Sequence, residues 1–168
     1  MGLIACGDDD VVSPVTKNII TQLLPDPEGT VTARITNDGN YKNGLEIGNG
    51  LSVIVYMDKM NNLIVKLGAG SLGDSPSIVN VGQVAGLSAI TKVPEEGFAE
   101  RVATSERDGF IIRCFTEIGY SWDHGSTYGY RVFCRLFLAS YIRDALGNII
   151  GATIKYQTGD DWVEKNEK

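Results

Sequence analysis

The sequence contains one histidine and three cysteines in 168 residues, and it has no excess of positive charge. A single histidine argues against a zinc site, which takes several His or Cys ligands. No stretch reaches the roughly 20 apolar residues that a membrane-spanning helix needs. A nucleic-acid-binding protein normally carries a basic stripe, whereas this chain has a net charge of −6. We therefore expect no bound metal or other cofactor and no nucleic-acid partner.

The acidic residues are concentrated at the two ends of the chain. Asp8, Asp9 and Asp10 lie near the start, and four more acids lie within residues 159–168. The body between these ends holds 14 acidic and 13 basic residues, so it is nearly neutral. The net charge therefore describes the ends of the chain and gives no information about a partner of the folded body.

A short apolar segment, Leu3-Ile4-Ala5-Cys6, leads to the first cysteine. It resembles a bacterial lipobox, in which small residues admit the modifying enzymes and the cysteine sulfur receives a diacylglycerol. The resemblance implies lipidation at Cys6 and a mature protein that begins there, and the alternative is a cysteine without a lipid. Because a signal peptide has a charged start and a longer apolar stretch, we expect further residues upstream in the native chain.

The acidic run after Cys6 bears on the location of the protein. Gly7-Asp8-Asp9-Asp10 resembles the surface-export signal of Bacteroides-type lipoproteins. This resemblance implies a protein held in the outer membrane by its lipid and displayed on the cell surface. The alternative is a solvated spacer on a protein that faces the periplasm.

Glycine is abundant, with 20 residues, which favours many tight turns and short strands. Val31, Ala33 and Ile35 alternate with polar residues, which is the period of a half-buried strand. Similar runs predict successive strands at residues 30–36, 51–57, 63–67, 77–84, 98–104, 110–117, 130–142 and 149–157. The short turns between them favour an all-β, mainly antiparallel fold, either a sandwich or an open barrel.

Four parts follow one another along the chain. Residues 1–10 form a truncated signal, lipobox and acidic linker, residues 11–29 a lead-in segment, residues 30–158 the β-rich domain, and residues 159–168 a charged tail. Within the lead-in, Ser13 and Pro14 favour the start of a short helix that Pro25 would end. An extended conformation is the alternative for this segment.

Several apolar and glycine-containing patterns resemble those of a known family. They comprise Val81-Gly82, Gly86-Leu87-Ser88-Ala89-Ile90 with Pro94, Gly97-Phe98-Ala99, Asp108-Gly109-Phe110, and Ile149-Ile150-Gly151-Ala152-Thr153-Ile154-Lys155-Tyr156-Gln157. Together they resemble a family of uncharacterised Bacteroides lipoproteins with a β-rich domain, over residues 30–157. The resemblance implies a β-rich fold and the cellular location of a lipoprotein. Since the family has no assigned activity, it implies no site residues.

Two further cysteines, Cys114 and Cys134, lie in neighbouring apolar runs. If these strands pair around a loop centred near His124, the two cysteines lie opposite each other and both face the core. A disulfide between them is permitted outside the cytoplasm and would add about 2–3 kcal/mol to the stability. The alternative is two buried free thiols that act as small hydrophobic residues.

Residues 119–130 form a predicted loop that holds one tryptophan, three tyrosines and the single histidine. Aromatic faces stack on sugar rings or peptide side chains, and polar neighbours add directional hydrogen bonds. The candidate ligand-binding residues are Trp122, Asp123, His124, Tyr128 and Tyr130. The alternative is a glycine-rich turn whose aromatic residues cap the core.

No catalytic constellation stands out in the sequence. Ser121, Asp123 and His124 are the residue types of a hydrolase triad, but triad residues usually come from separate elements. We therefore predict a non-enzymatic binding or interaction module, anchored by lipid at the cell surface, whose ligand is a glycan or a protein. The alternatives are a structural accessory subunit of an envelope complex and a hydrolase with a site formed by distant carboxylates.

Overall fold

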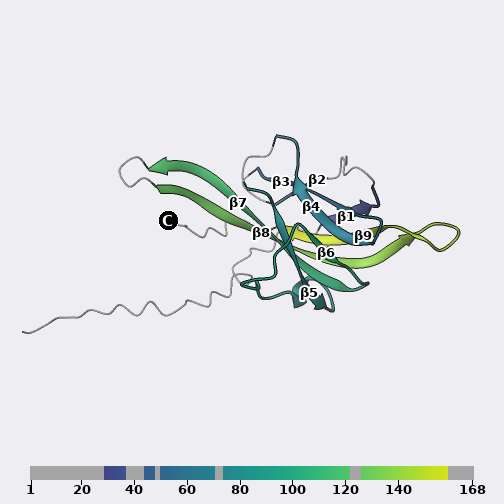
Figure 1. Cartoon of the computed structure of the whole chain (residues 1–168). Coiled ribbons are helices and arrows are strands. Elements are labelled where there is room, and N and C mark those ends of the chain that lie inside the picture. The colour runs from purple at the N-terminus through teal and green to yellow at the C-terminus, as the bar shows by residue number, and fades with distance from the viewer. Residues whose placement is uncertain (1–28, 37–43, 48–49, 71–73, 122–125, 159–168) are drawn as a thin grey trace, which may run out of the picture.

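The computed structural model describes residues 29–36, 44–47, 50–70, 74–121 and 126–158, with the backbone alone for residues 116–121 and 126–131 (Figure 1). Across these residues the chain forms nine β-strands in two antiparallel sheets, with one short 3₁₀ helix and no closed barrel. The all-β, antiparallel prediction is confirmed. Of the two architectures expected, the arrangement is consistent with the sandwich.

The larger sheet has the strand order β1-β9-β8-β7-β5 (Figure 1). Its strands are β1 (Gly29–Arg34), β5 (Ser77–Gln83), β7 (Asp108–Ser121), β8 (Ser126–Arg143) and β9 (Ile149–Thr158). The smaller sheet has the order β2-β3-β4-β6, with β2 (Gly44–Glu46), β3 (Ser52–Met57), β4 (Asn62–Leu67) and β6 (Arg101–Ala103).

Each of the eight predicted strands has a counterpart, but the boundaries differ in two regions. β2 was not predicted, because its three residues, the first of them a glycine, are too few to show an alternating pattern. β7 and β8 are both longer than predicted and enter the segment that was expected to be a loop. The predicted helix after Ser13, Cys6 with its acidic run, and the charged tail lie outside the described residues. No helix in the described part of the chain is long and apolar enough to cross a membrane.

The main core lies between the two sheets and follows the two-residue period of the strands. In β3, Val53, Val55 and Met57 are buried while Ile54 and Tyr56 are half-buried. From the larger sheet, the inward residues of β7, β8 and β9 complete this core; they are Phe110, Ile112, Cys114, Val132, Cys134, Leu136, Leu138, Ala152 and Ile154. Burying each large apolar side chain contributes about 1.5–3 kcal/mol, so this interface is the main stabilising contact between the sheets.

A second apolar cluster covers the outer face of the larger sheet. The segment after β5 includes the 3₁₀ helix η2 (Leu87–Ala89), and its Leu87 and Ile90 pack with Ile111 and Phe133. Because the sheet is covered on both faces here, β7 has five consecutive buried residues, 108–112, instead of strict alternation. The larger sheet is therefore the middle layer of the described body.

The β3–β4 hairpin closes through the side chain of Asp58. Its Oδ1 accepts hydrogen bonds from the N–H groups of Met60 (2.8 Å) and Asn62 (2.9 Å), and its Oδ2 accepts one from Asn62 Nδ2 (2.9 Å). Asn61 has a φ of 63°, a left-handed conformation that asparagine tolerates. Burial raises the pKa of Asp58, but the hydrogen bonds from Asn62 and Met60 and the charge of Arg101 outweigh it, so the pKa is lower than usual.

The β8–β9 hairpin closes in the same way. Asp144 Oδ1 accepts hydrogen bonds from the N–H groups of Leu146 (2.9 Å) and Asn148 (2.8 Å), and Oδ2 accepts one from Asn148 Nδ2 (2.9 Å). The left-handed position is Gly147, with a φ of 85°. The two hairpins therefore share one pattern, in which an aspartate at the first position and an asparagine at the fifth hold the turn.

The two sheets meet along two seams that differ in how completely they are closed. At the seam between β5 and the segment before β6, Ile78 and Ala99 exchange two backbone hydrogen bonds of 2.7 and 2.9 Å. At the seam between β1 and the smaller sheet, Thr36 N–H donates to Met57 C=O at 3.1 Å, at the end of β1. The remainder of this second seam borders the groove described below.

We predict that Asp58→Ala lowers the melting temperature by about 2–4 °C at neutral pH, because the turn N–H groups lose their acceptor. The pKa of Asp58 is lower in the folded state, so its contribution is complete above the unfolded-state value of about 3.9 and is lost as the pH falls through the folded value. Thermal melts across this range should show the wild-type and variant curves converging in acid.

Lys59→Ala is the matched control, since Lys59 is an exposed neighbour in the same turn. It should leave the melting temperature unchanged at every pH. Equal melting temperatures for Asp58→Ala and the wild type at neutral pH would contradict the role of the carboxylate.

Candidate functional site

The predicted aromatic loop is only partly a loop. Trp122, Asp123 and His124 lie outside the described residues, whereas Tyr128 and Tyr130 belong to the backbone of β8, opposite Gly119 and Thr116. The prediction of a loop over residues 119–130 was therefore wrong at both ends. Tyrosine and threonine favour strands, and the ladder accommodates its glycines with a register shift between residues 117 and 119.

The paired ends of β7 and β8 form an arm that extends beyond the rest of the larger sheet. Among the described residues, β5 pairs with β7 as far as Arg113, and β9 pairs with β8 as far as Cys134. Beyond these points, seven residue pairs join β7 and β8 to each other, from Cys114 opposite Val132 to Ser121 opposite Ser126, over a length of roughly 24 Å. Figure 1 shows this arm projecting from the body. At its base, Asp74 N–H donates to Phe115 C=O at 2.8 Å.

Cys114 and Cys134 are both buried free thiols in the core between the sheets. The expected register was wrong, because Cys114 lies opposite Val132 and Cys134 lies opposite Ile112. The two cysteines are thus diagonal neighbours and not a directly opposed pair; diagonal positions are typically about 7–8 Å apart, somewhat less between Cβ atoms, while a disulfide needs Cβ atoms about 4 Å apart. The prediction that both side chains face the core is confirmed.

The thiols are chemically shielded by this placement. Burial, together with the charge of Asp74, raises the pKa of Cys114 to about 11. Burial also raises the pKa of Cys134. Cys114 Sγ donates to Asp74 C=O at 3.2 Å and Cys134 Sγ to Arg135 C=O at 3.7 Å, so both act as packed, weakly donating groups.

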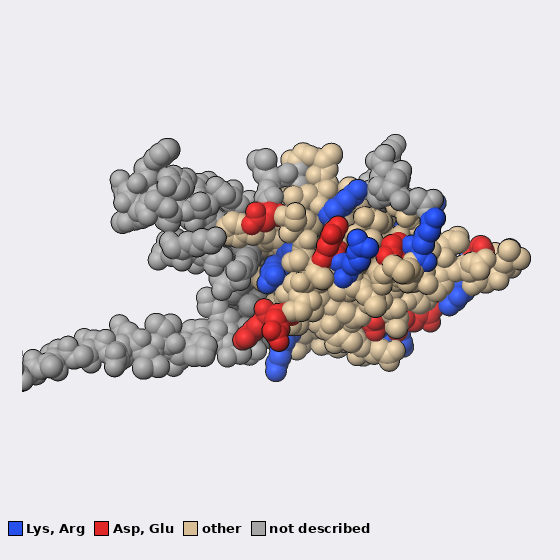
Figure 2. Space-filling view, in the orientation of Figure 1, with Lys and Arg blue, Asp and Glu red and all other residues tan. Residues whose placement is uncertain are grey.

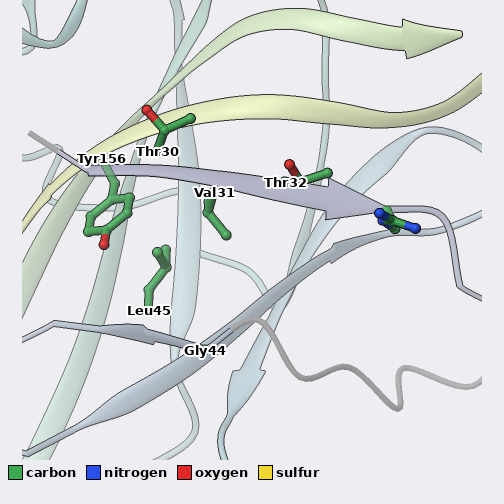
Figure 3. A pocket seen from close by; sticks show the side chains of 7 residues that line it. Thr30, Val31, Thr32, Gly44, Leu45 and Tyr156 are labelled. Carbon is green, nitrogen blue, oxygen red and sulfur yellow. The ribbon is translucent and has the colours of Figure 1, made fainter.

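A groove of about 420 Å³ lies where the edge of the larger sheet faces the edge of the smaller one. In Figure 3 the side chains of Val31, Leu45 and Tyr156 point into the space between β1 and β2. Thr30 and Thr32 project from the other side of β1 and form the rim. Arg34 and Gly44 complete the lining. The volume is within the range of small-ligand sites.

The groove combines one aromatic ring, hydroxyl groups and one positive charge. Arg34 is exposed, and no ion pair to it occurs within the described residues. The seven lining residues include no carboxylate, so the local field favours an anionic or neutral polar ligand. A Cβ added at Gly29 would clash with the ring of Tyr156, which shows how closely the ring lies against the start of β1.

Sequence reasoning missed this groove because its residues come from three distant segments. The alternating pattern identifies the strand of Val31, but nothing in the sequence indicates that this strand pairs with the strand of Tyr156. Leu45 belongs to β2, which was not predicted. The sequence does contain one signal. Tyr156 follows the buried Ala152 and Ile154 on the same face of β9, and its polar hydroxyl group indicates that this end of the strand lies at the margin of the core.

Within the described residues, neither the distribution of charged side chains in Figure 2 nor the placement of potential metal ligands indicates a further candidate site. On the face drawn in Figure 2, basic and acidic side chains occur side by side over the described body. The described residues contain no group of three or more His, Cys, Asp or Glu side chains that could hold a metal ion. Comparison with protein-family models, with curated proteins and with solved structures found no match to this chain.

We predict that the two core thiols react with a disulfide reagent such as DTNB only after unfolding. A thiol with a pKa near 11 is almost entirely protonated at mildly alkaline pH, and its burial blocks the reagent. The Cys6→Ser variant removes the one thiol outside the described residues. Native Cys6→Ser protein should release almost no thionitrobenzoate, and denatured protein should release two equivalents. Rapid labelling of the native variant would contradict the packing.

Proposed function

We propose that this protein is a lipid-anchored binding module of the outer cell surface, and that the groove between β1 and β2 holds its ligand. Lipidation at Cys6 and the outer-membrane location are proposed from the sequence, on the lipobox-like segment and the acidic run after it. The groove is the observation that carries the binding role. It is a concave, partly polar site of about 420 Å³ on a rigid two-sheet body.

The lining of the groove suits either a glycan or a protein segment. The Tyr156 ring offers a face for a sugar ring or a peptide side chain, and Val31 and Leu45 form an apolar floor. The hydroxyl groups of Thr30 and Thr32 and the guanidinium of Arg34 line the same groove and are groups able to hydrogen-bond a polar ligand.

The arm favours a second candidate function, that of an accessory subunit which packs against an envelope complex. Seven residue pairs extend over roughly 24 Å beyond the described pairing with β5 and β9, and the part past the buried Cys114 and Val132 can reach a partner. In this role, and in a glycan-binding role, the residues proposed from the sequence to supply the contacts are Trp122, Asp123, His124, Tyr128 and Tyr130. A hydrolase with distant carboxylates draws no support from the groove, since no carboxylate lines it.

We predict that ligands of the groove stabilise the wild-type protein but not Tyr156→Ala. A thermal-shift screen against defined oligosaccharides, synthetic peptides and divalent metals measures this effect. At a ligand concentration of about 100 Kd the stabilisation is about 2.7 kcal/mol, which is a shift of several degrees. Tyr56→Ala is the matched control, because Tyr56 is a half-buried tyrosine on β3 that does not line the groove. Equal shifts for both variants would remove the groove from consideration.

The arm is tested separately with Trp122→Ala. If the tip contacts the ligand, this change should weaken binding on a glycan array or to a purified partner by tenfold or more, as expected for a central aromatic contact. Leu146→Ala is the control, since Leu146 is an 88% exposed apolar residue in another hairpin turn. Unchanged binding by Trp122→Ala would exclude the tip.

A further inference from the structure

Three neighbouring strands of the larger sheet, β1, β9 and β8, contain no acidic residue within their bounds. Two acids adjoin β8: Asp144 lies in the turn that follows it, and Glu106 Oε1 accepts a hydrogen bond of 3.4 Å from Tyr141 N–H. The basic residues of the three strands are Arg34, Arg131, Arg135, Arg143 and Lys155. Because no carboxylate within the strands offsets these charges, this part of the sheet favours anions although the whole chain is acidic.

The register of β1 on β9 places two of these basic residues on one face of the sheet. Lys155 lies opposite Thr30, and Thr153 lies opposite Thr32. Directly opposite residues of an antiparallel ladder point to the same side, and so do alternate residues of one strand. In Figure 3, Thr30 and Thr32 project from one side of β1, in agreement with this rule. We call this set the threonine face; it comprises Thr30, Thr32, Arg34, Thr153 and Lys155.

No described apolar residue covers the threonine face. Its members Thr30, Arg34 and Lys155 are exposed, and its two other threonines are half-buried. The outer apolar cluster lies on the same side of the sheet, since its Phe137 is opposite Lys155, but it includes no residue of β1 or β9. Neither Arg34 nor Lys155 forms an ion pair with a described residue. Both charges can therefore pair with a ligand.

The two cations of the threonine face are separated along the strands. Lys155 lies at the level of Thr30, which is four residues from Arg34, so the two backbone positions are roughly 13 Å apart. This spacing suits acidic groups on different units of one chain better than a single small anion. Between the cations, Thr153 carries a hydroxyl group, which can both donate and accept hydrogen bonds. The face therefore matches a ligand that combines spaced carboxylates with hydroxyl groups.

We infer that the ligand of this binding module is an acidic oligosaccharide, whose carboxylates pair with Arg34 and Lys155 while its hydroxyl groups lie against the threonines between them. This inference rests on the proposed binding role of the groove. It extends the site from the groove, which Thr30 and Arg34 already line, across the rim to Lys155. A single-stranded nucleic acid is also a spaced polyanion, but the threonine face has no aromatic residue on which a base could stack.

The test compares acidic with neutral oligosaccharides on the folded protein. The probes are a set of uronate oligomers that includes oligogalacturonate, malto-oligosaccharides of the same lengths, and a short single-stranded DNA of similar charge. The variants are Arg34→Gln, Lys155→Gln and the two combined, each of which replaces an exposed charge by a polar side chain. Lys59→Gln is the matched control, because it removes an exposed lysine in the β3–β4 turn.

The expected result is that a uronate oligomer binds the wild type and Lys59→Gln alike, while the neutral oligomer of the same length binds much more weakly. Arg34→Gln and Lys155→Gln should each weaken binding about three- to fivefold and reduce its salt dependence. The combined variant should weaken it about tenfold or more, since the effects of separated sites add. In an NMR titration of the wild type, the amide resonances of the threonine face should shift, which gives a readout that needs no variant.

Four results would overturn the inference. Binding of neutral oligosaccharides or of peptides alone, abolished by Tyr156→Ala, would retain the proposed function and reject the acidic ligand. Uronate binding that the combined variant leaves unchanged, without shifts on the threonine face, would place the ligand elsewhere. Equal affinity for the DNA would indicate general attraction of polyanions and no recognition of a sugar. Absence of binding by any oligosaccharide or peptide would reject both proposals.

Discussion

The packing of the β7–β8 hairpin on both of its faces is the constraint on which the rest of the structure depends. Phe110, Ile112 and Cys114 point into the core between the sheets, while Ile111 and Phe133 point into the outer cluster. One ladder therefore joins two apolar cores. Every other strand of the larger sheet is placed by its pairing with this hairpin or with β9 beside it.

A sandwich leaves strand edges where its two sheets end, and this one treats its two seams differently. One seam is closed by paired bonds between Ile78 and Ala99. The other is joined at the end of β1 through Thr36 and then borders a groove. The proposed binding role follows from that asymmetry together with Tyr156 and Arg34 at the groove.

The strands were predictable to the extent that their patterns are local. The alternation around Val31 and Ala33 identified β1 and its inward face. The register of the two cysteines was not predictable. The part of the β7–β8 ladder that contains them is centred one residue earlier in the chain than expected, so each cysteine lies two positions away from the point opposite the other. β2 was not predicted because only its pairing with β3 shows that Leu45 belongs to a strand.

The sequence by itself determined the class of fold, the approximate position of eight strands and the side chains that face inward. The reason is that alternation of apolar and polar residues is a property of neighbouring positions in the chain. It also supplied the features from which lipidation at Cys6 is proposed. Only the tertiary structure decided the register of β7 on β8, the two free thiols and the groove that joins Val31, Leu45 and Tyr156. These depend on which strands become neighbours, and that choice comes from packing over the whole chain and not from any one segment of it.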